Sequence, residues 1–145
     1  MIWRLIDDIL VIRMDTGDDI YESVKSACRA AGVTTGFMSG FGATRFAEIH
    51  AGDEDAGTFG ESIFEGKMEL VTLTGDVLMQ ADDLCSHIHV VLAGPKGLTV
   101  YAGHLEKGIV QNLCEIYLYP LKTTIGKRPF GPWYIMDLES VEGSV

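Results

Sequence analysis

Short apolar segments of the kind that form β-strands run through most of this chain, and they limit its fold more than any other feature. Each segment is rich in Val, Ile, Thr, Leu or Tyr and is bounded by glycine or acidic residues, as is typical of strands that are separated by turns. The expected strands are residues 2–6, 9–14, 33–39, 44–50, 67–79, 85–93, 98–104 and 110–119. This pattern predicts that a sheet makes up most of the structure.

One stretch carries a clear helix signal. Four apolar residues recur at helical spacing after an acidic start: Ile20, Val24, Cys28 and Ala31. An Asp or Thr within residues 16–19 can cap the start of a helix, and Gly32 suits a left-handed end. We therefore expect a surface helix of about three turns that covers one face of the sheet.

The chain length predicts one domain that spans residues 1–145, because 145 residues is close to the usual size of a single domain. Residues 52–61 are expected to form an exposed acidic loop. A Pro- and aromatic-rich extension begins at about residue 120 and holds three of the four prolines, Pro120, Pro129 and Pro132. We expect it to be an extended segment whose aromatic side chains are buried over the sheet or across a subunit.

The charge of the chain argues against direct DNA binding. Eleven Lys and Arg face twenty-one Asp and Glu, and residues 1–115 carry the whole net charge of −10, which repels a phosphate backbone. The three cysteines, Cys28, Cys85 and Cys114, are widely spaced and odd in number, so a reduced, cytoplasmic location is expected. No apolar run approaches the length of a membrane span.

The most informative stretch is a predicted hairpin that contains three histidines. Two apolar runs, 85–93 and 98–104, flank a Gly-Pro-Lys-Gly sequence that favours a turn. If residues 94–97 form the loop, Ala93 pairs with Leu98 and His87 lies opposite His104. His89 then lies opposite Ala102.

Strand geometry places these three histidines together. His87 and His89 point to the same face because side chains alternate along a strand, and the predicted pairing brings His104 to that face. Three imidazoles with an open fourth position form a typical site for a divalent transition metal, zinc first, with iron or nickel as alternatives. Water or Cys85 would complete the site. His50 ends a different strand and is expected to be an ordinary surface histidine.

The same hairpin resembles the plant and prokaryote conserved (PPC) domain family, in the form of its bacterial and archaeal members. The resemblance is carried by the Ser-His-Ile-His sequence at residues 86–89 and by the Gly-His-Leu at residues 103–105. Four further segments resemble family motifs in the same order along the chain, and they are residues 17–20, 38–43, 66–75 and 112–116. The likeness runs from about residue 4 to residue 119.

This resemblance implies an α/β domain of the α+β kind with a mixed, largely antiparallel sheet that assembles as a homotrimer. It also implies metal ligands at His87, His89 and His104. Plant relatives join the domain to short basic AT-hooks and act in transcription, but this chain has no Arg-Gly-Arg-Pro hook. The resemblance therefore does not imply DNA binding through AT-hooks for this chain.

Two carboxylates in apolar strands, Glu69 and Glu115, are candidates to orient a ligand histidine or to serve as a general base. The alternative for each is a solvent-facing position, and the resemblance favours a subunit-interface role for Glu69. Three functions remain open: a metal centre that binds a small anionic ligand or supports metal-assisted chemistry, a DNA-associated regulatory protein, and a trimer stabilised by a structural metal. The sequence leaves open whether the protein is an enzyme.

Overall fold

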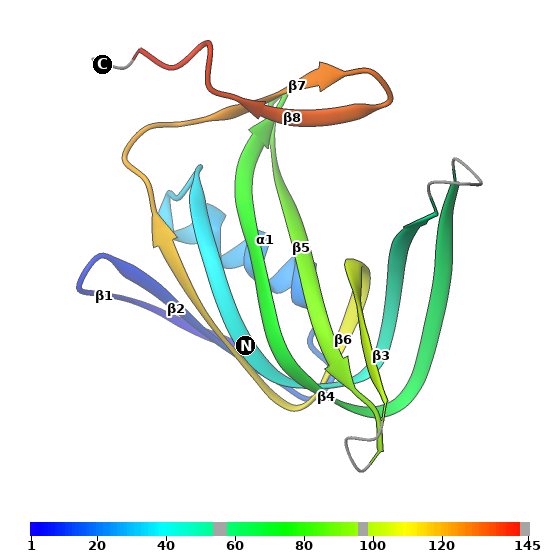
Figure 1. Ribbon diagram of the computed structural model, residues 1–145. Helices are drawn as coiled ribbons and strands as arrows, with labels where there is room; N and C mark the ends of the chain where they lie inside the picture. Colours follow the sequence, from blue (N-terminus) through cyan, green and yellow to red (C-terminus); the bar gives the residue numbers. More distant parts are fainter. Residues whose placement is uncertain (54–57, 96–98, 143–145) are drawn as a thin grey trace.

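The computed structural model describes residues 1–53, 58–95 and 99–142, and it shows a strongly curved sheet covered on one side by a single helix (Figure 1). The elements follow one another as β1 (Ile2–Ile6), β2 (Ile9–Asp15), α1 (Ile20–Ala31), β3 (Gly36–Asp53), β4 (Thr58–Gln80), β5 (Asp83–Ala93), β6 (Val100–Pro120), β7 (Gly126–Phe130) and β8 (Trp133–Asp137). Every pairing is antiparallel except that of β4 with β7. The expected mixed, largely antiparallel sheet with one covering helix is thus confirmed.

Helix α1 begins and ends where the sequence predicts. The Asp19 side chain accepts a hydrogen bond from the backbone N–H of Glu22, and Gly32 ends the helix in the left-handed conformation at φ 70°. Its inner face packs into the core through Ile20, Val24 and Cys28. Burial raises the pKa of the Cys28 thiol to about 12, so at neutral pH this side chain packs as a small apolar residue. Among the described residues, no helix has the length and apolar character needed to cross a membrane.

Three strands are much longer than the sequence indicates. Residues 36–39 and 44–50 of two expected strands belong to the single strand β3, and residues 100–104 and 110–119 of two others belong to β6. The expected acidic loop at 52–61 is also mostly strand, because Asp53 pairs with Thr58 at the end of the β3–β4 hairpin, while residues 54–57 lie outside the described residues. Because β3, β4 and β6 are long, they can bend and pair with other strands along both of their edges.

These long strands close part of the sheet into a ring. Strand β3 pairs with β4 and β6, and β5 pairs with the other edges of the same two strands. Apolar side chains fill the side of the sheet that faces α1, among them Met38, Leu73, Ile88 and Ile116. Every second residue of β5 contributes to this core, so the residues between them, His87 and His89, lie on the opposite face.

The segment Met38–Ala43 is continuous strand with a bulge. Its glycines allow β3 and β6 to approach closely, since a Cβ atom on Gly40 would lie 2.5 Å from the Glu115 carbonyl oxygen. Only a residue without a side chain fits there.

The described part of the C-terminal extension differs from one of the two expectations, burial of its aromatic residues over the sheet, while burial across a subunit remains a prediction. It forms the antiparallel β7–β8 hairpin, which joins the sheet through a parallel bridge between Met79 and Gly126. Its aromatic side chains are not buried by the rest of the chain, as Phe130, Trp133 and Tyr134 are 60%, 51% and 53% exposed. The hairpin lies over one end of the sheet (Figure 1).

We predict that Gly40→Ala lowers the free energy of unfolding by about 1–3 kcal/mol, because the added methyl group forces β3 away from β6. Urea unfolding followed by circular dichroism measures this change. Gly60→Ala is the matched control, since a Cβ atom on this strand glycine would be 3.8 Å from its nearest neighbour, the Ala51 carbonyl oxygen. Equal stability of the two variants would contradict the close approach of the strands.

Candidate metal centre

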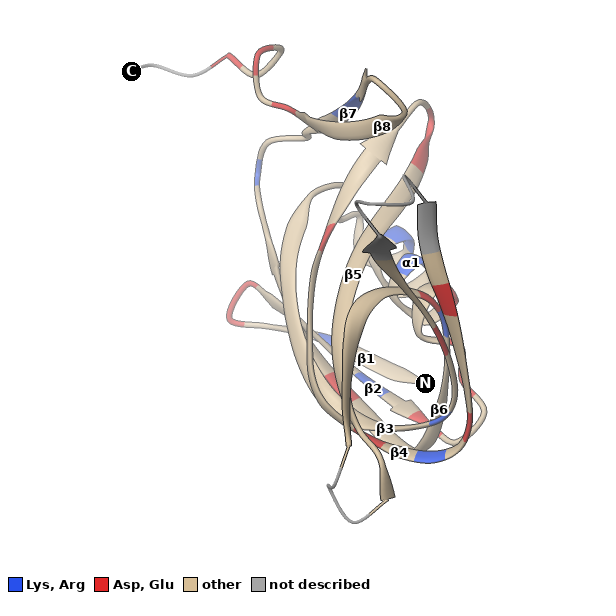
Figure 2. Cartoon of the chain, turned by 45° about the vertical axis from the view of Figure 1, so that its right-hand side comes forward, with Lys and Arg blue, Asp and Glu red and all other residues tan. Residues whose placement is uncertain are grey.

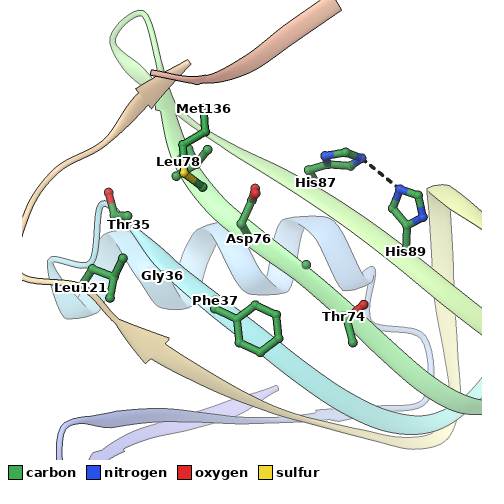
Figure 3. A pocket seen from close by; sticks show the side chains of 11 residues that line it. Thr35, Gly36, Phe37, Thr74, Asp76, Leu78, His87, His89, Leu121 and Met136 are labelled. Atoms are coloured by element: carbon green, nitrogen blue, oxygen red, sulfur yellow. Dashed lines mark hydrogen bonds between the residues drawn. The ribbon is translucent and has the colours of Figure 1, made fainter. Parts of the chain in front are cut away.

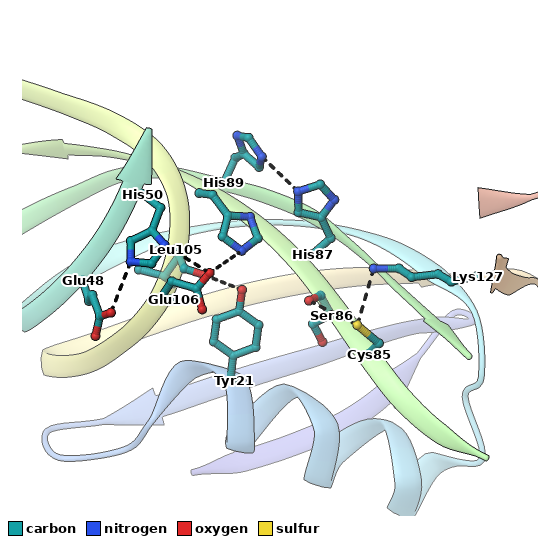
Figure 4. A network of polar contacts seen from close by, with 11 residues as sticks. Tyr21, Glu48, His50, Cys85, Ser86, His87, His89, Leu105, Glu106 and Lys127 are labelled. Atoms are coloured by element: carbon teal, nitrogen blue, oxygen red, sulfur yellow. Dashed lines mark hydrogen bonds and ion pairs between the residues drawn. The ribbon is translucent and has the colours of Figure 1, made fainter. Parts of the chain in front are cut away.

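Three histidines from two neighbouring strands meet on the face of the sheet opposite α1 (Figure 4). His87 and His89 come from β5 and His104 comes from β6, and one ring nitrogen from each lies within 4.8 Å of the others. The ring centroids of the three pairs are 4.9–5.6 Å apart. The structure therefore brings together the three histidines that the sequence analysis grouped.

The pairing of the hairpin differs from the prediction by two residues. His104 lies opposite His89 instead of His87, and Ala93 pairs with Val100 instead of Leu98. The reason is a longer loop, because the backbone N–H of Gly94 donates to the carbonyl of Thr99 at 2.8 Å. Lys96, Gly97 and Leu98, which belong to the predicted turn and its first pair, lie outside the described residues. A shift of two residues keeps each side chain on its original face.

The donor set fits a transition metal. Zinc–nitrogen distances of about 2.0–2.1 Å in a tetrahedral site place two ligand nitrogens about 3.3 Å apart. The Nε2 atoms of His87 and His89 are already 3.1 Å apart. Partial burial lowers the pKa of His87 and of His104, and neighbouring imidazoles lower both pKa values further. Both rings are therefore held in the neutral form that binds metals.

A carboxylate that the sequence analysis missed contacts this cluster. Glu106 Oε1 lies 3.3 Å from His104 Nε2 and 3.5 Å from His50 Nδ1. Glu106 follows His104 by two residues on β6, so the alternation of side chains was a usable signal.

His50 is also closer to the centre than expected. It lies directly opposite His104 on the neighbouring strand β3, and its Nε2 atom is 3.3 Å from Glu48 Oε1. Its side chain is 27% exposed. No short-range signal reveals this position, because residues 50 and 104 come together only through the pairing of β3 with β6.

Asp76 is a second missed carboxylate. It lies on β4 directly opposite His87, and its Oδ1 atom is buried without a hydrogen-bond partner among the described residues. Burial raises the pKa of Asp76, although the Lys127 charge and a hydrogen bond from the His87 backbone counteract part of this effect. Asp76 lines a cavity of about 320 Å³ together with His87, His89 and Phe37 (Figure 3).

Glu69 and Glu115 lie away from the histidines. Glu69 is exposed on β4 opposite Ala43 and Ala93, and Glu115 lies on β6 opposite Phe41 and Arg13. Neither carboxylate lines one of the two described cavities that contain the histidines. The interface role of Glu69 remains a prediction.

The second cavity, which we call the histidine cavity, is larger at about 710 Å³. All four histidines line it, and β7 and β8 contribute Lys127, Trp133 and Tyr134. Lys127 Nζ donates a hydrogen bond to Cys85 Sγ at 3.4 Å, on the same face of β5 as the cluster (Figure 4). Cys85 is not a member of the three-histidine group.

Comparison with known proteins gives both a family and related structures. Residues 5–122 match the model of the Plants and Prokaryotes Conserved (PCC) domain, whereas no curated protein sequence matches the chain. A plant- and prokaryote-conserved protein from Pyrococcus horikoshii is 25% identical, with a TM-score of 0.77 and 90% of each chain covered.

Two further structures share this fold. A metal-containing protein from Archaeoglobus fulgidus is 25% identical, with a TM-score of 0.75, and the match covers 88% of this chain and 90% of that one. A protein from Bacteroides thetaiotaomicron with a suggested DNA-binding role has a TM-score of 0.85 at 19% identity, over 94% of this chain and 96% of that one. At 19% identity the likeness concerns the fold alone.

Proposed function

Because the chain belongs to the Plants and Prokaryotes Conserved (PCC) domain family, we propose that its three clustered histidines bind a divalent transition metal and form the functional centre of the protein. The observation that carries this proposal is the meeting of His87, His89 and His104, with their ring nitrogens within 4.8 Å of one another. The metal-containing relative from Archaeoglobus fulgidus supports it. Zinc is the first candidate, and iron or nickel also suit three imidazoles.

The residues around the centre support a site that remains open to a ligand. Among the described residues, the cluster holds three donors and no fourth cysteine or carboxylate, which favours a reactive or ligand-binding centre over a closed structural one. Glu106 would fix the orientation of His104 through its contact at 3.3 Å. When bound, the metal would act as a Lewis acid toward an oxygen of a small anionic ligand.

We predict that the protein purified without added metal contains about one equivalent of metal per chain, and that His89→Ala removes most of it while the fold persists. Plasma mass spectrometry measures the content, and circular dichroism checks the fold. His50→Ala is the matched control and keeps its metal, because His50 is not one of the three clustered donors. Metal affinity decreases as the pH falls, since protons compete for the imidazole nitrogens. Equal metal content in the two variants would refute the site.

We also propose that the protein assembles as a homotrimer in the cytoplasm. The sheet face that carries the histidines continues into an exposed apolar surface, where Phe37 and Tyr119 are paired neighbours that are 52% and 46% exposed. A second copy of the chain would cover this surface. The three cysteines are free in the structure, which suits a reduced compartment.

Light scattering is expected to give a mass of about three times the chain mass of 15.8 kDa. A Phe37→Glu, Tyr119→Glu double variant should shift to a smaller mass with an unchanged circular dichroism spectrum, because buried carboxylates destabilise an apolar interface. A stable monomer of the unmodified protein at micromolar concentration would exclude the trimer.

A DNA-associated role is the alternative, and the charge distribution disfavours it. Asp and Glu outnumber Lys and Arg by ten, and the Lys and Arg positions of the described residues are spread over several elements of the chain (Figure 2). We predict negligible binding to duplex DNA at physiological salt, measured by fluorescence anisotropy of a labelled duplex. Tight binding that weakens as salt is raised would favour the DNA-associated function instead.

A further inference from the structure

Lys127 occupies an unusual position for a lysine. It lies on β7, it is only partly exposed, and its side chain reaches across to the face of β5 that carries the histidines (Figure 4). Its ammonium group donates a hydrogen bond to the sulfur of Cys85 at 3.4 Å, which is only a weak acceptor. A partly buried ammonium group is costly unless an acceptor of opposite charge balances it.

No carboxylate of the described residues forms an ion pair with Lys127. The neighbouring cation on the same strand behaves differently, since Arg128 is paired with Glu139 at 2.6 Å and with Asp137 at 3.7 Å. Asp76 is near enough for the Lys127 charge to oppose part of the rise in the Asp76 pKa that burial causes, but the two side chains are not an ion pair. Lys127 is also the one cationic side chain among the described residues that line the histidine cavity.

Aromatic side chains form the wall of the cavity beside this lysine. Trp133 and Tyr134 come from β8, pair with Phe130 and Pro129 of β7, and are about half exposed. Both aromatic side chains line the histidine cavity, as Lys127 does. Such side chains bind flat molecules by stacking and by burial of apolar area.

The distance between the lysine and the histidine cluster limits the size of a ligand. Lys127 contacts Cys85, and the cluster begins two residues further along β5 at His87. Two residues of a strand span about 7 Å. A molecule of one ring with one carboxylate covers that distance.

We propose that the histidine cavity binds a small planar carboxylate, with the carboxylate on Lys127, the flat body against Trp133 and Tyr134, and the far end at the histidine centre. This inference rests on the proposed metal function for the far end of the ligand. Lys127 and the two aromatic residues form their part of the site without the metal. The β7–β8 hairpin is therefore the specificity-determining element of the cavity.

Calorimetric titration with benzoate tests the proposal, with benzamide as the uncharged analogue and sulfate as an anion without a ring. The titrations use the zinc-loaded and the metal-free protein. Lys127→Met keeps most of the length of the side chain and removes its charge. Lys122→Met is the matched control, because Lys122 is exposed in the same terminal segment and does not line the cavity.

We expect benzoate to bind the unmodified protein and Lys122→Met equally, and to bind Lys127→Met at least about tenfold more weakly, as for a lost charge-assisted hydrogen bond. Benzamide and sulfate should also bind at least about tenfold more weakly than benzoate. Benzoate binding that is absent, that is unchanged in Lys127→Met, or that is matched by sulfate would overturn the proposal.

The two proposals fail in different ways. If the metal content is normal but benzoate binding does not depend on Lys127, the carboxylate site is refuted and the metal centre is not. If benzoate binding depends on Lys127 but the protein takes up no zinc, the metal centre is refuted and the carboxylate site is not.

Discussion

The pairing of β6 with two different strands is the constraint on which this structure depends. At His104 the strand has β5 on one edge and β3 on the other, so this residue lies directly opposite both His89 and His50. The backbone hydrogen bonds of three strands thus fix the spacing of the histidines before any side-chain contact is made. Gly103 belongs to the same constraint, since a Cβ atom there would lie 2.7 Å from the His50 carbonyl oxygen.

The hydrophobic core and the histidine cluster lie on opposite faces of the same strands, so the residues that stabilise the fold are different from those that line the site. Ile88 packs under α1, while its neighbours His87 and His89 project to the other side. Tyr21 of α1 donates a hydrogen bond to the carbonyl oxygen of Leu105 at 2.5 Å, which anchors the strand next to His104. The helix therefore stabilises the backbone next to His104 from the core face of the sheet. The polar side chains on the opposite face remain available to bind a ligand.

The sequence predicts most of this arrangement where a local rule applies. Alternation along a strand placed His87 and His89 on one face, and a capping Asp or Thr within residues 16–19, which the structure shows to be Asp19, and Gly32 marked the ends of α1. The register of the hairpin was wrong by two residues, because the loop closes between Gly94 and Thr99, and a loop length is not encoded by alternation. The merging of segments into β3 and β6 was missed because glycines that permit close strand contact resemble glycines that form turns.

The attachment of the β7–β8 hairpin has a consequence for exchange with solvent. The hairpin pairs with the rest of the sheet through the parallel bridge of Met79 with Gly126, next to a hydrogen bond from the Met79 N–H to the Ile125 carbonyl at 3.0 Å. The ring of β3, β4, β5 and β6 needs none of these contacts. Elements held by so few backbone bonds open at a free energy far below that of global unfolding. The hairpin that forms one wall of the histidine cavity can therefore open to solvent while the rest of the sheet stays folded.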